Sequence, residues 1–294
     1  MSLTPAARGH LAMLGFSACV AGSFSLGSMA APHIAPAALN ALRFLLGTTL
    51  LAGLVFARGG VPRTALTAPW RYLLIGALMA VYFLLMFEGL KTAEAVSMSA
   101  VFTLTPVMAA GFGWLLMRQR MSGRIALGLA IGAAGALWVI FRADLAALLA
   151  FAPGRGETVF FFGCAAHAVY APLVPRLNRG EPGLIFTLGT MLAATLVLLV
   201  WGWSDIMVTD WAELPPIVWV TILYTTLAAT ALSTVLLQYA AMRLPSAKVM
   251  AYTYLIPSWV ILWELALGRG APPALILVGV AMSVLAVLLL LRDG

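Results

Sequence analysis

Long runs of apolar residues, separated by short polar stretches, follow one another along the whole chain. Each run extends over about twenty residues, the length that a helix needs to cross the hydrocarbon core of a bilayer. The runs lack the alternation of polar and apolar residues that is typical of membrane β-strands. The pattern therefore predicts an all-α polytopic membrane protein, in contact with the lipid bilayer.

Turn and charge signals between the apolar runs predict ten transmembrane helices. Stretches such as "ARGGVPR", "RQRMSGR" and "APGRGE" mark where one helix ends and the next begins. The expected spans are residues 10–30, 36–57, 70–91, 93–117, 122–141, 157–177, 181–202, 215–241, 245–267 and 271–291.

The overall composition agrees with a membrane protein. Hydrophobic residues make up 63% of the chain and charged residues 9%, whereas soluble domains carry about 25% charge. The net charge of +7 does not indicate nucleic-acid binding, because the basic residues lie in loops and form no stripe. Cys19 and Cys164 both lie in apolar runs and predict neither a disulfide nor a metal site. We expect no cofactor.

The basic residues divide unequally between the two sides of the predicted bundle. Twelve Lys and Arg residues fall in the loops on the side of the N-terminus, and four fall on the opposite side. Because cytoplasmic loops are enriched in Lys and Arg, both termini are expected to be cytoplasmic. The location that follows is a bacterial inner membrane.

The two halves of the chain correspond when one is shifted by 151 residues. The shift pairs Ala100 with Ala251, Leu104 with Leu255, Pro106 with Pro257, Arg118 with Arg269 and Gly128 with Gly279. We interpret residues 1–144 and 145–294 as two copies of a five-helix unit. A unit with an odd number of spans must be inverted on its second use, and such inverted repeats are typical of secondary transporters.

Three phrases in the chain resemble the drug/metabolite transporter superfamily, in particular its ten-helix EamA-type members. They are "ALNALRFLLG", "FEGLKTAEAVSMSAVFTLTPVMAA" and "LQYAAMRLPSAKVMAYTYLIPSWVILWELALG". The resemblance implies a central cavity between the two halves, a small-molecule substrate and alternating access without an ATPase domain. Within the superfamily, the chain is most similar to bacterial exporters of aromatic and neutral amino acids.

The chain departs from the family pattern in one respect. Members often carry a glutamate after the fourth and ninth spans, where this chain reads "LLMRQR" and "LALGRG". A role for that glutamate is therefore not transferred to this protein. The alternative function is a multidrug or other-metabolite exporter of the same superfamily. The small multidrug relatives depend on a glutamate in the first helix, and the first span of this chain has no glutamate, which counts against this alternative.

Pro106 and Pro257 lie within apolar runs, at matching positions of the two halves. Proline removes one helical hydrogen bond, so it frees the carbonyls of Phe102 and Thr253. The functional interpretation is a pair of gating hinges beside a cavity. The alternative is a pair of static kinks that serve packing, since proline is common in membrane helices.

Aromatic rings, hydroxyls and one histidine gather at similar depths of the predicted helices. Because ionisable residues inside a membrane tend to face the bundle interior, His167 is the central candidate of this group. A neutral cavity of this kind suits an amino acid with an apolar or aromatic side chain. The predicted substrate-binding residues are Tyr82, Met86, Ser99, Phe102, His167, Tyr170, Ser233, Tyr252, Thr253 and Trp259. For each of them, ordinary helix packing is the alternative.

Arg43 is a basic residue inside a predicted span. It could pair with a carboxylate or a helix C-terminus, or extend toward the membrane interface. No Asp or Glu lies at the middle of a span, which argues against a carboxylate-based ion relay and is compatible with a uniporter or exchanger.

Other classes of membrane protein fit the sequence less well. An enzyme would need a nucleophile and base, or metal ligands, at one place, and His167 has no second histidine or carboxylate near it in the sequence. We therefore expect no catalytic residues. A channel or structural membrane protein remains as a further alternative, and a monomer is the simplest expectation for the assembly.

Overall fold

The structure is a computed structural model that describes residues 4–118, 122–150, 153–241, 243–244, 249 and 251–291. All regular elements in this part of the chain are helices. In chain order they are α1 (Pro5–Ala30), α2 (Pro36–Ala57), η1 (Arg63–Leu66), α3 (Trp70–Gly89), α4 (Ala95–Phe102), α5 (Thr105–Met117), α6 (Gly123–Ile140), α7 (Leu145–Ala150), α8 (Arg155–Leu177), α9 (Gly183–Trp201), α10 (Trp203–Val208), α11 (Pro216–Thr226), η2 (Leu227–Leu232), α12 (Ser233–Ala241), η3 (Tyr252–Leu255), α14 (Ile256–Ala266) and α15 (Ile276–Leu291).

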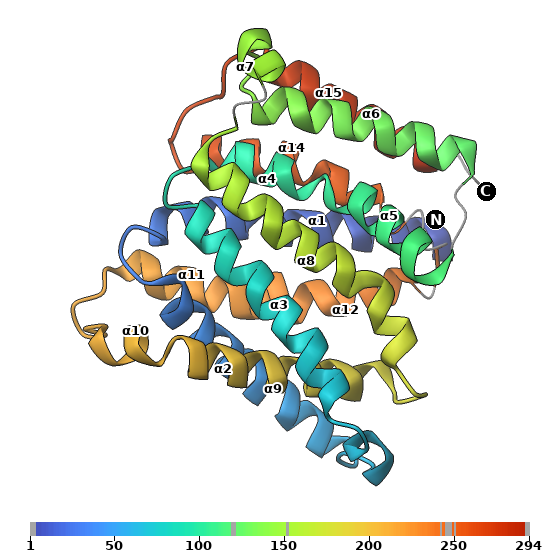
Figure 1. Ribbon diagram of the computed structural model, residues 1–294, viewed down its shortest axis with the longest axis vertical. Helices are drawn as coiled ribbons and strands as arrows, with labels where there is room; N and C mark the ends of the chain where they lie inside the picture. Colours follow the sequence, from blue (N-terminus) through green and yellow to red (C-terminus); the bar gives the residue numbers. More distant parts are fainter. Residues whose placement is uncertain are drawn as a thin grey trace.

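The long helices run side by side across the molecule (Figure 1). α1 begins and α15 ends at one end of the bundle, while the short helices α7 and α10 lie at the opposite end. α6 packs against α15 along one edge, and α2 packs against α9 along the other. α1 and α8 lie between these edges, α1 against α12 and α14, and α8 against α3 and α5.

Eight helical segments in the described residues are long and apolar enough to cross a membrane. They correspond to the first eight predicted spans, with α4 and α5 together forming the fourth and α11 to α12 the eighth. The ninth predicted span, 245–267, includes residues outside the described ranges; its described part is η3 and α14. The tenth corresponds to α15, which is apolar but has 16 residues. The chain is thus an all-α, multi-pass membrane protein.

Large apolar side chains cover the outer faces of the bundle. Phe56, Trp114, Phe162 and Val200 are all more than 60% exposed, as expected for surfaces that face lipid rather than water. The interior holds a second set of apolar residues from α1, α3, α4, α6, α8 and α14. An apolar exterior around an apolar interior is what the high hydropathy of the sequence requires.

Both predicted prolines mark interruptions of a helix. α4 ends at Phe102, and Pro106 lies in the first turn of α5. Pro257 lies in the first turn of α14, directly after the 3₁₀ segment η3. A proline is tolerated in the first turn of a helix, where its missing N–H would have no partner. Their role as gating hinges stays a prediction.

The eighth span contains a π-helical segment, η2, between α11 and α12. Thr230 lies in this segment and donates its hydroxyl to the carbonyl of Thr225, five residues earlier, at 2.8 Å. π-helical segments are rare and are frequent at functional sites. Sequence patterns did not predict this irregularity, because the residues "LAATAL" are compatible with an ordinary helix.

Candidate functional site

An aromatic cluster in the bundle interior contains four of the predicted site residues. The Tyr82 ring lies 4.6 Å from His167 and 5.9 Å from Phe102, measured between ring centroids. His167 stacks on Tyr170 with a centroid distance of 5.4 Å and an interplanar angle of 10°. Phe160 joins the cluster at 5.7 Å from Tyr82. Three helices, α3, α4 and α8, therefore bring these rings together.

His167 has a polar atom without a partner inside this cluster. Its Nδ1 is buried and makes no hydrogen bond. A buried polar atom without a partner costs about 1–3 kcal/mol. His167 therefore offers a donor or an acceptor, depending on its tautomer, to a molecule placed beside the rings.

Arg43 lies over the ring of Phe83, the neighbour of Tyr82. Its Cζ is 4.1 Å from the centroid of the Phe83 ring, and that ring lies 4.6 Å from Tyr82. Its Nη2 donates to Thr230 Oγ1 at 3.0 Å. Arg43 is 2% exposed, so it does not extend to the membrane interface, and no carboxylate among the described residues pairs with it. The structure thus places a buried cation next to the aromatic cluster.

The remaining predicted site residues lie in several places. Met86 is buried in the same apolar core as Tyr82. Ser99 donates to the carbonyl of Val96 at 2.7 Å, and Ser233 donates to the carbonyl of Ala229 at 2.8 Å, so both hydroxyls are satisfied within their own chain segment.

The predicted residues of η3 and α14 lie apart from the aromatic cluster or at its edge. Tyr252 bonds through its hydroxyl to Nδ1 of His10 at 2.8 Å, in a separate core cluster near the start of α1. Thr253 is buried beside it in η3. Trp259 donates its Nε1 to Ser17 Oγ at 3.0 Å and packs against the central core. The structure therefore groups the predicted residues unequally, mainly around α3 and α8.

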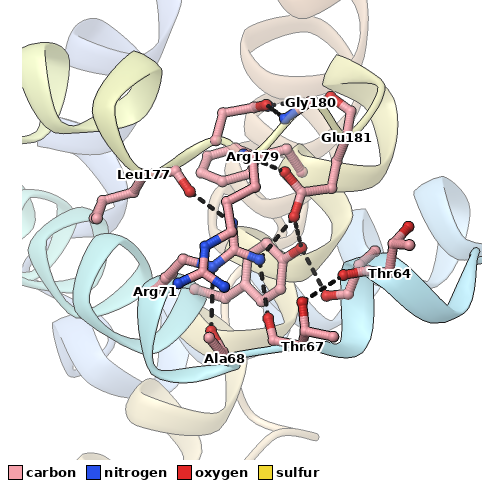
Figure 2. Close-up of polar contacts among 12 residues, drawn as sticks. Thr64, Thr67, Ala68, Arg71, Leu177, Arg179, Gly180 and Glu181 are labelled. Carbon is pink, nitrogen blue, oxygen red and sulfur yellow. Dashed lines mark hydrogen bonds and ion pairs between the residues drawn. The ribbon is translucent and has the colours of Figure 1, made fainter.

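A second buried arginine has hydrogen-bond partners on all three guanidinium nitrogens. Arg71, at the start of α3, donates through Nη2 to Glu181 Oε1 at 2.7 Å and through Nη1 to the carbonyl of Leu177 at 2.6 Å. It also donates to the carbonyls of Thr67 and Ala68. Figure 2 shows Arg71 and Glu181 at the centre of this network, which we call the Arg71–Glu181 clamp. The sequence did not predict this ion pair, because both residues lie at helix ends, where charged residues are usually exposed in loops.

The clamp joins α3 to the loop between α8 and α9. The backbone N–H of Arg179 donates to Glu181 Oε2 at 2.6 Å, and the Tyr72 hydroxyl lies 3.3 Å from Glu181 Oε1. The hydrogen bond from Arg71, together with that N–H, lowers the pKa of the Glu181 carboxyl to about 2, although burial acts in the opposite direction. Glu181 is therefore ionised at neutral pH, and the clamp is a complete ion pair.

The lowered pKa predicts how stability depends on pH. An acid whose pKa is lowered by folding stabilises the fold above its ordinary pKa of 4.5, and this contribution is lost as the pH falls toward about 2. In Glu181→Gln the contribution is absent at every pH. The difference in unfolding temperature between wild type and this variant, measured in detergent micelles, should therefore shrink across this window. A difference that stays constant from neutral pH down to about pH 2 would contradict the assignment.

Metal coordination receives no support from the described residues, among which no group of three His, Cys, Asp or Glu side chains is placed to hold an ion. The chemistry available in the bundle interior is that of aromatic rings, the buried Arg43 and unpaired polar atoms. Such a set is able to bind and orient a small organic molecule.

Comparison with known proteins gives a consistent result. The model of the EamA-like transporter family matches the chain twice, over residues 7–141 and 154–292. The uncharacterized transporter YyaM of Bacillus subtilis strain 168 is 23% identical over 193 residues, which cover 65% of this chain and 63% of YyaM, less than two thirds of its length. A solved structure described as "Crystal structure of protein" shares the fold, with a TM-score of 0.68, 20% identity and 94% of each chain covered.

Proposed function

The chain belongs to the EamA-like transporter family, within the drug/metabolite transporter superfamily, and on this premise we propose that it is a secondary transporter that exports or facilitates the passage of neutral and aromatic amino acids. The family match and the relative YyaM support a membrane transporter. The substrate class is our proposal, and its main support is the interior cluster in which Tyr82, His167 and Tyr170 lie beside the buried Arg43.

The proposed mechanism is alternating access between two inverted five-helix repeats. The helix contacts support it, since they are nearly symmetric under exchange of the halves. α3 packs on α8 as α12 packs on α1, and α3 packs on α9 as α11 packs on α2. The pairs α2 with α9, α4 with α14 and α6 with α15 join equivalent elements of the two halves. The two matches to one family model agree with the same division.

The orientation we propose has both termini in the cytoplasm of a bacterial cell. The excess of Lys and Arg in loops on the side of the N-terminus supports it. α1 begins and α15 ends at one end of the bundle, in agreement with an even number of spans (Figure 1).

The aromatic cluster suits a neutral or aromatic amino acid. Its rings offer faces on which an apolar or aromatic side chain can stack, in contacts worth about 0.5–1.5 kcal/mol each. The buried Arg43 disfavours an organic cation at this place, because two like charges would meet in a medium of low dielectric. This argues for amino acids over the multidrug alternative.

The experiment that tests this proposal measures flux. Proteoliposomes preloaded with labelled phenylalanine, tryptophan, threonine or methionine should release label in a saturable, protein-dependent way, and external substrate should stimulate release by counterflow. Absence of protein-dependent flux for all four would overturn the amino-acid assignment. Flux of an aromatic cation such as tetraphenylphosphonium in its place would favour the multidrug alternative.

The same assay tests the site. His167→Ala should lower phenylalanine flux about two- to tenfold, the equivalent of one hydrogen bond of about 0.5–1.5 kcal/mol. His33→Ala is the matched control, because His33 is exposed in the turn that follows α1. Equal flux from both variants at equal membrane expression would remove His167 from the site.

A further inference from the structure

Helix α2 carries an amide and a guanidinium that are both buried and one helical turn apart. Asn40 is fully buried and Arg43 is 2% exposed. Residues three apart on a helix are neighbours on one face, with about 5–6 Å between their Cβ atoms. Both contact Phe83 of α3: Asn40 Nδ2 lies 3.4 Å from the Phe83 carbonyl, and the Arg43 guanidinium lies over the Phe83 ring.

The charge of Arg43 is incompletely compensated. Its Nε and Nη1 are buried and have no hydrogen-bond partner. A guanidinium stays protonated in proteins and carries only donors. The cation–π contact with Phe83 and the bond to Thr230 offset part of the desolvation. The donors on Nε and Nη1 are left for an anion, and a guanidinium forms charge-assisted hydrogen bonds with a carboxylate.

Asn40 complements Arg43 with an unpaired acceptor. Its Nδ2 donates to the carbonyl of Pro36 at 2.9 Å as well as to that of Phe83. These carbonyls only accept, so they fix which end of the amide is Nδ2. The other end, Oδ1, is buried without a donor. A buried oxygen of this kind suits an ammonium group.

We propose that the Asn40–Arg43 pair binds the charged end of a zwitterionic substrate, with the carboxylate on Arg43 and the ammonium on Asn40 Oδ1. This inference rests on the proposed function and names the chemical class that the site recognises, an α-amino acid with both charges free. The substrate side chain then lies toward the rings of Phe83 and Tyr82. Thr230, in the π-helical segment η2, positions the guanidinium through its bond to Nη2.

Three related probes separate the two contacts in the full-length protein in detergent micelles. Phenylalanine has both charges, phenylalaninamide lacks the carboxylate, and 3-phenylpropanoate lacks the ammonium. Binding is measured as the ligand-induced rise in unfolding temperature. Phenylalanine should bind about 10- to 100-fold more tightly than phenylalaninamide, because a hydrogen bond to a charged group contributes about 1.5–3 kcal/mol. It should also bind more tightly than 3-phenylpropanoate.

Two variants assign the preferences to their residues. Arg43→Gln should bind phenylalanine and phenylalaninamide equally while it keeps the preference over 3-phenylpropanoate. Asn40→Ala should show the reverse pattern. Arg58→Gln is the matched control, since Arg58 ends the same helix and is exposed; it should keep both preferences. If a variant does not fold, the probe preferences of the wild type still decide the question.

The outcomes distinguish this inference from the proposed function. Phenylalanine flux without any preference over its amide would overturn the inference and leave the proposed function standing. A carboxylate preference that is lost in Arg43→Gln, without flux of any amino acid, would support the binding pair and overturn the transport assignment. Failure of phenylalanine, tryptophan, threonine and methionine to stabilise the wild type would overturn the inference.

Discussion

Replacement of Arg71 by alanine is expected to lower the free energy of unfolding by about 3–5 kcal/mol, because it leaves the Glu181 carboxylate buried without its cation. The side chains of the pair are 1% and 3% exposed, and the two atoms that join them are 2.7 Å apart. Arg71 also donates to three backbone carbonyls of the clamp, which lose their donor in the variant. Chemical unfolding in mixed detergent micelles measures the loss.

The exposed pair between Arg142 and Glu94 is the control for this prediction. Its atoms are 4.0 Å apart, and its side chains are 59% and 65% exposed. An exposed pair contributes about 0–1 kcal/mol, so Arg142→Ala should change stability little. The double variant Arg71→Leu with Glu181→Leu should recover part of the loss, because no charge is then buried. Equal losses from Arg71→Ala and Arg142→Ala would contradict the clamp.

Replacement of Gly156 by leucine is expected to reduce transport about tenfold or more. A Cβ atom at Gly156 would collide with the backbone oxygen of Gly89 and lie 2.6 Å from the Cβ of Ala93, so the end of α3 must move away from the start of α8. Beside this contact, Ser97 donates to Glu157 at 2.7 Å. Overpacking costs about 1–3 kcal/mol, and about 1.4 kcal/mol changes an equilibrium tenfold. The substitution therefore disfavours the close contact between the end of α3 and the start of α8.

Counterflow of phenylalanine in proteoliposomes measures this effect, and Gly111→Leu is its control. Gly111 is a helical glycine of α5, and a Cβ atom added to it would have no neighbouring heavy atom within 4 Å. This variant should transport like the wild type. Unchanged transport in Gly156→Leu, in a protein that folds and reaches the bilayer, would show that close approach of α3 and α8 is not required.

The sequence allowed the helical fold to be predicted for a physical reason. A span must satisfy its backbone internally and present an apolar surface to lipid, and both requirements appear as uninterrupted apolar runs. The two prolines also predicted local structure, since helix interruptions precede both Pro106 and Pro257 in the structure. The π-helical segment was not predictable, because its residues have no local property that forbids an ordinary helix.

The candidate site could be predicted only in part. Tyr82, His167 and Tyr170 were identified by chemistry and depth, and the structure brings them together. Asn40 was missed, although it lies in the phrase "ALNALRFLLG". Asn40 is a candidate because its Oδ1 has no hydrogen-bond donor. Which groups surround this side chain depends on how α3 packs against α2, and the sequence does not show that.

The distinction between the two buried arginines was also invisible in the sequence. The sequence pattern assigns Arg71 to a loop and Arg43 to a transmembrane span. The structure buries both but supplies a carboxylate to Arg71, whereas the described residues supply none to Arg43. Partners more than 100 positions away in the sequence decide how completely each guanidinium is paired.

The Arg71–Glu181 clamp limits how the two sequence copies can separate from each other. It ties α3, which belongs to the first match of the family model, to the loop between α8 and α9, which belongs to the second. A motion that parted the chain along the boundary between its two sequence copies would have to separate this ion pair. For the proposed transport cycle we therefore expect rigid bodies that draw helices from both copies, with a line of motion that differs from the line along which the sequence repeats.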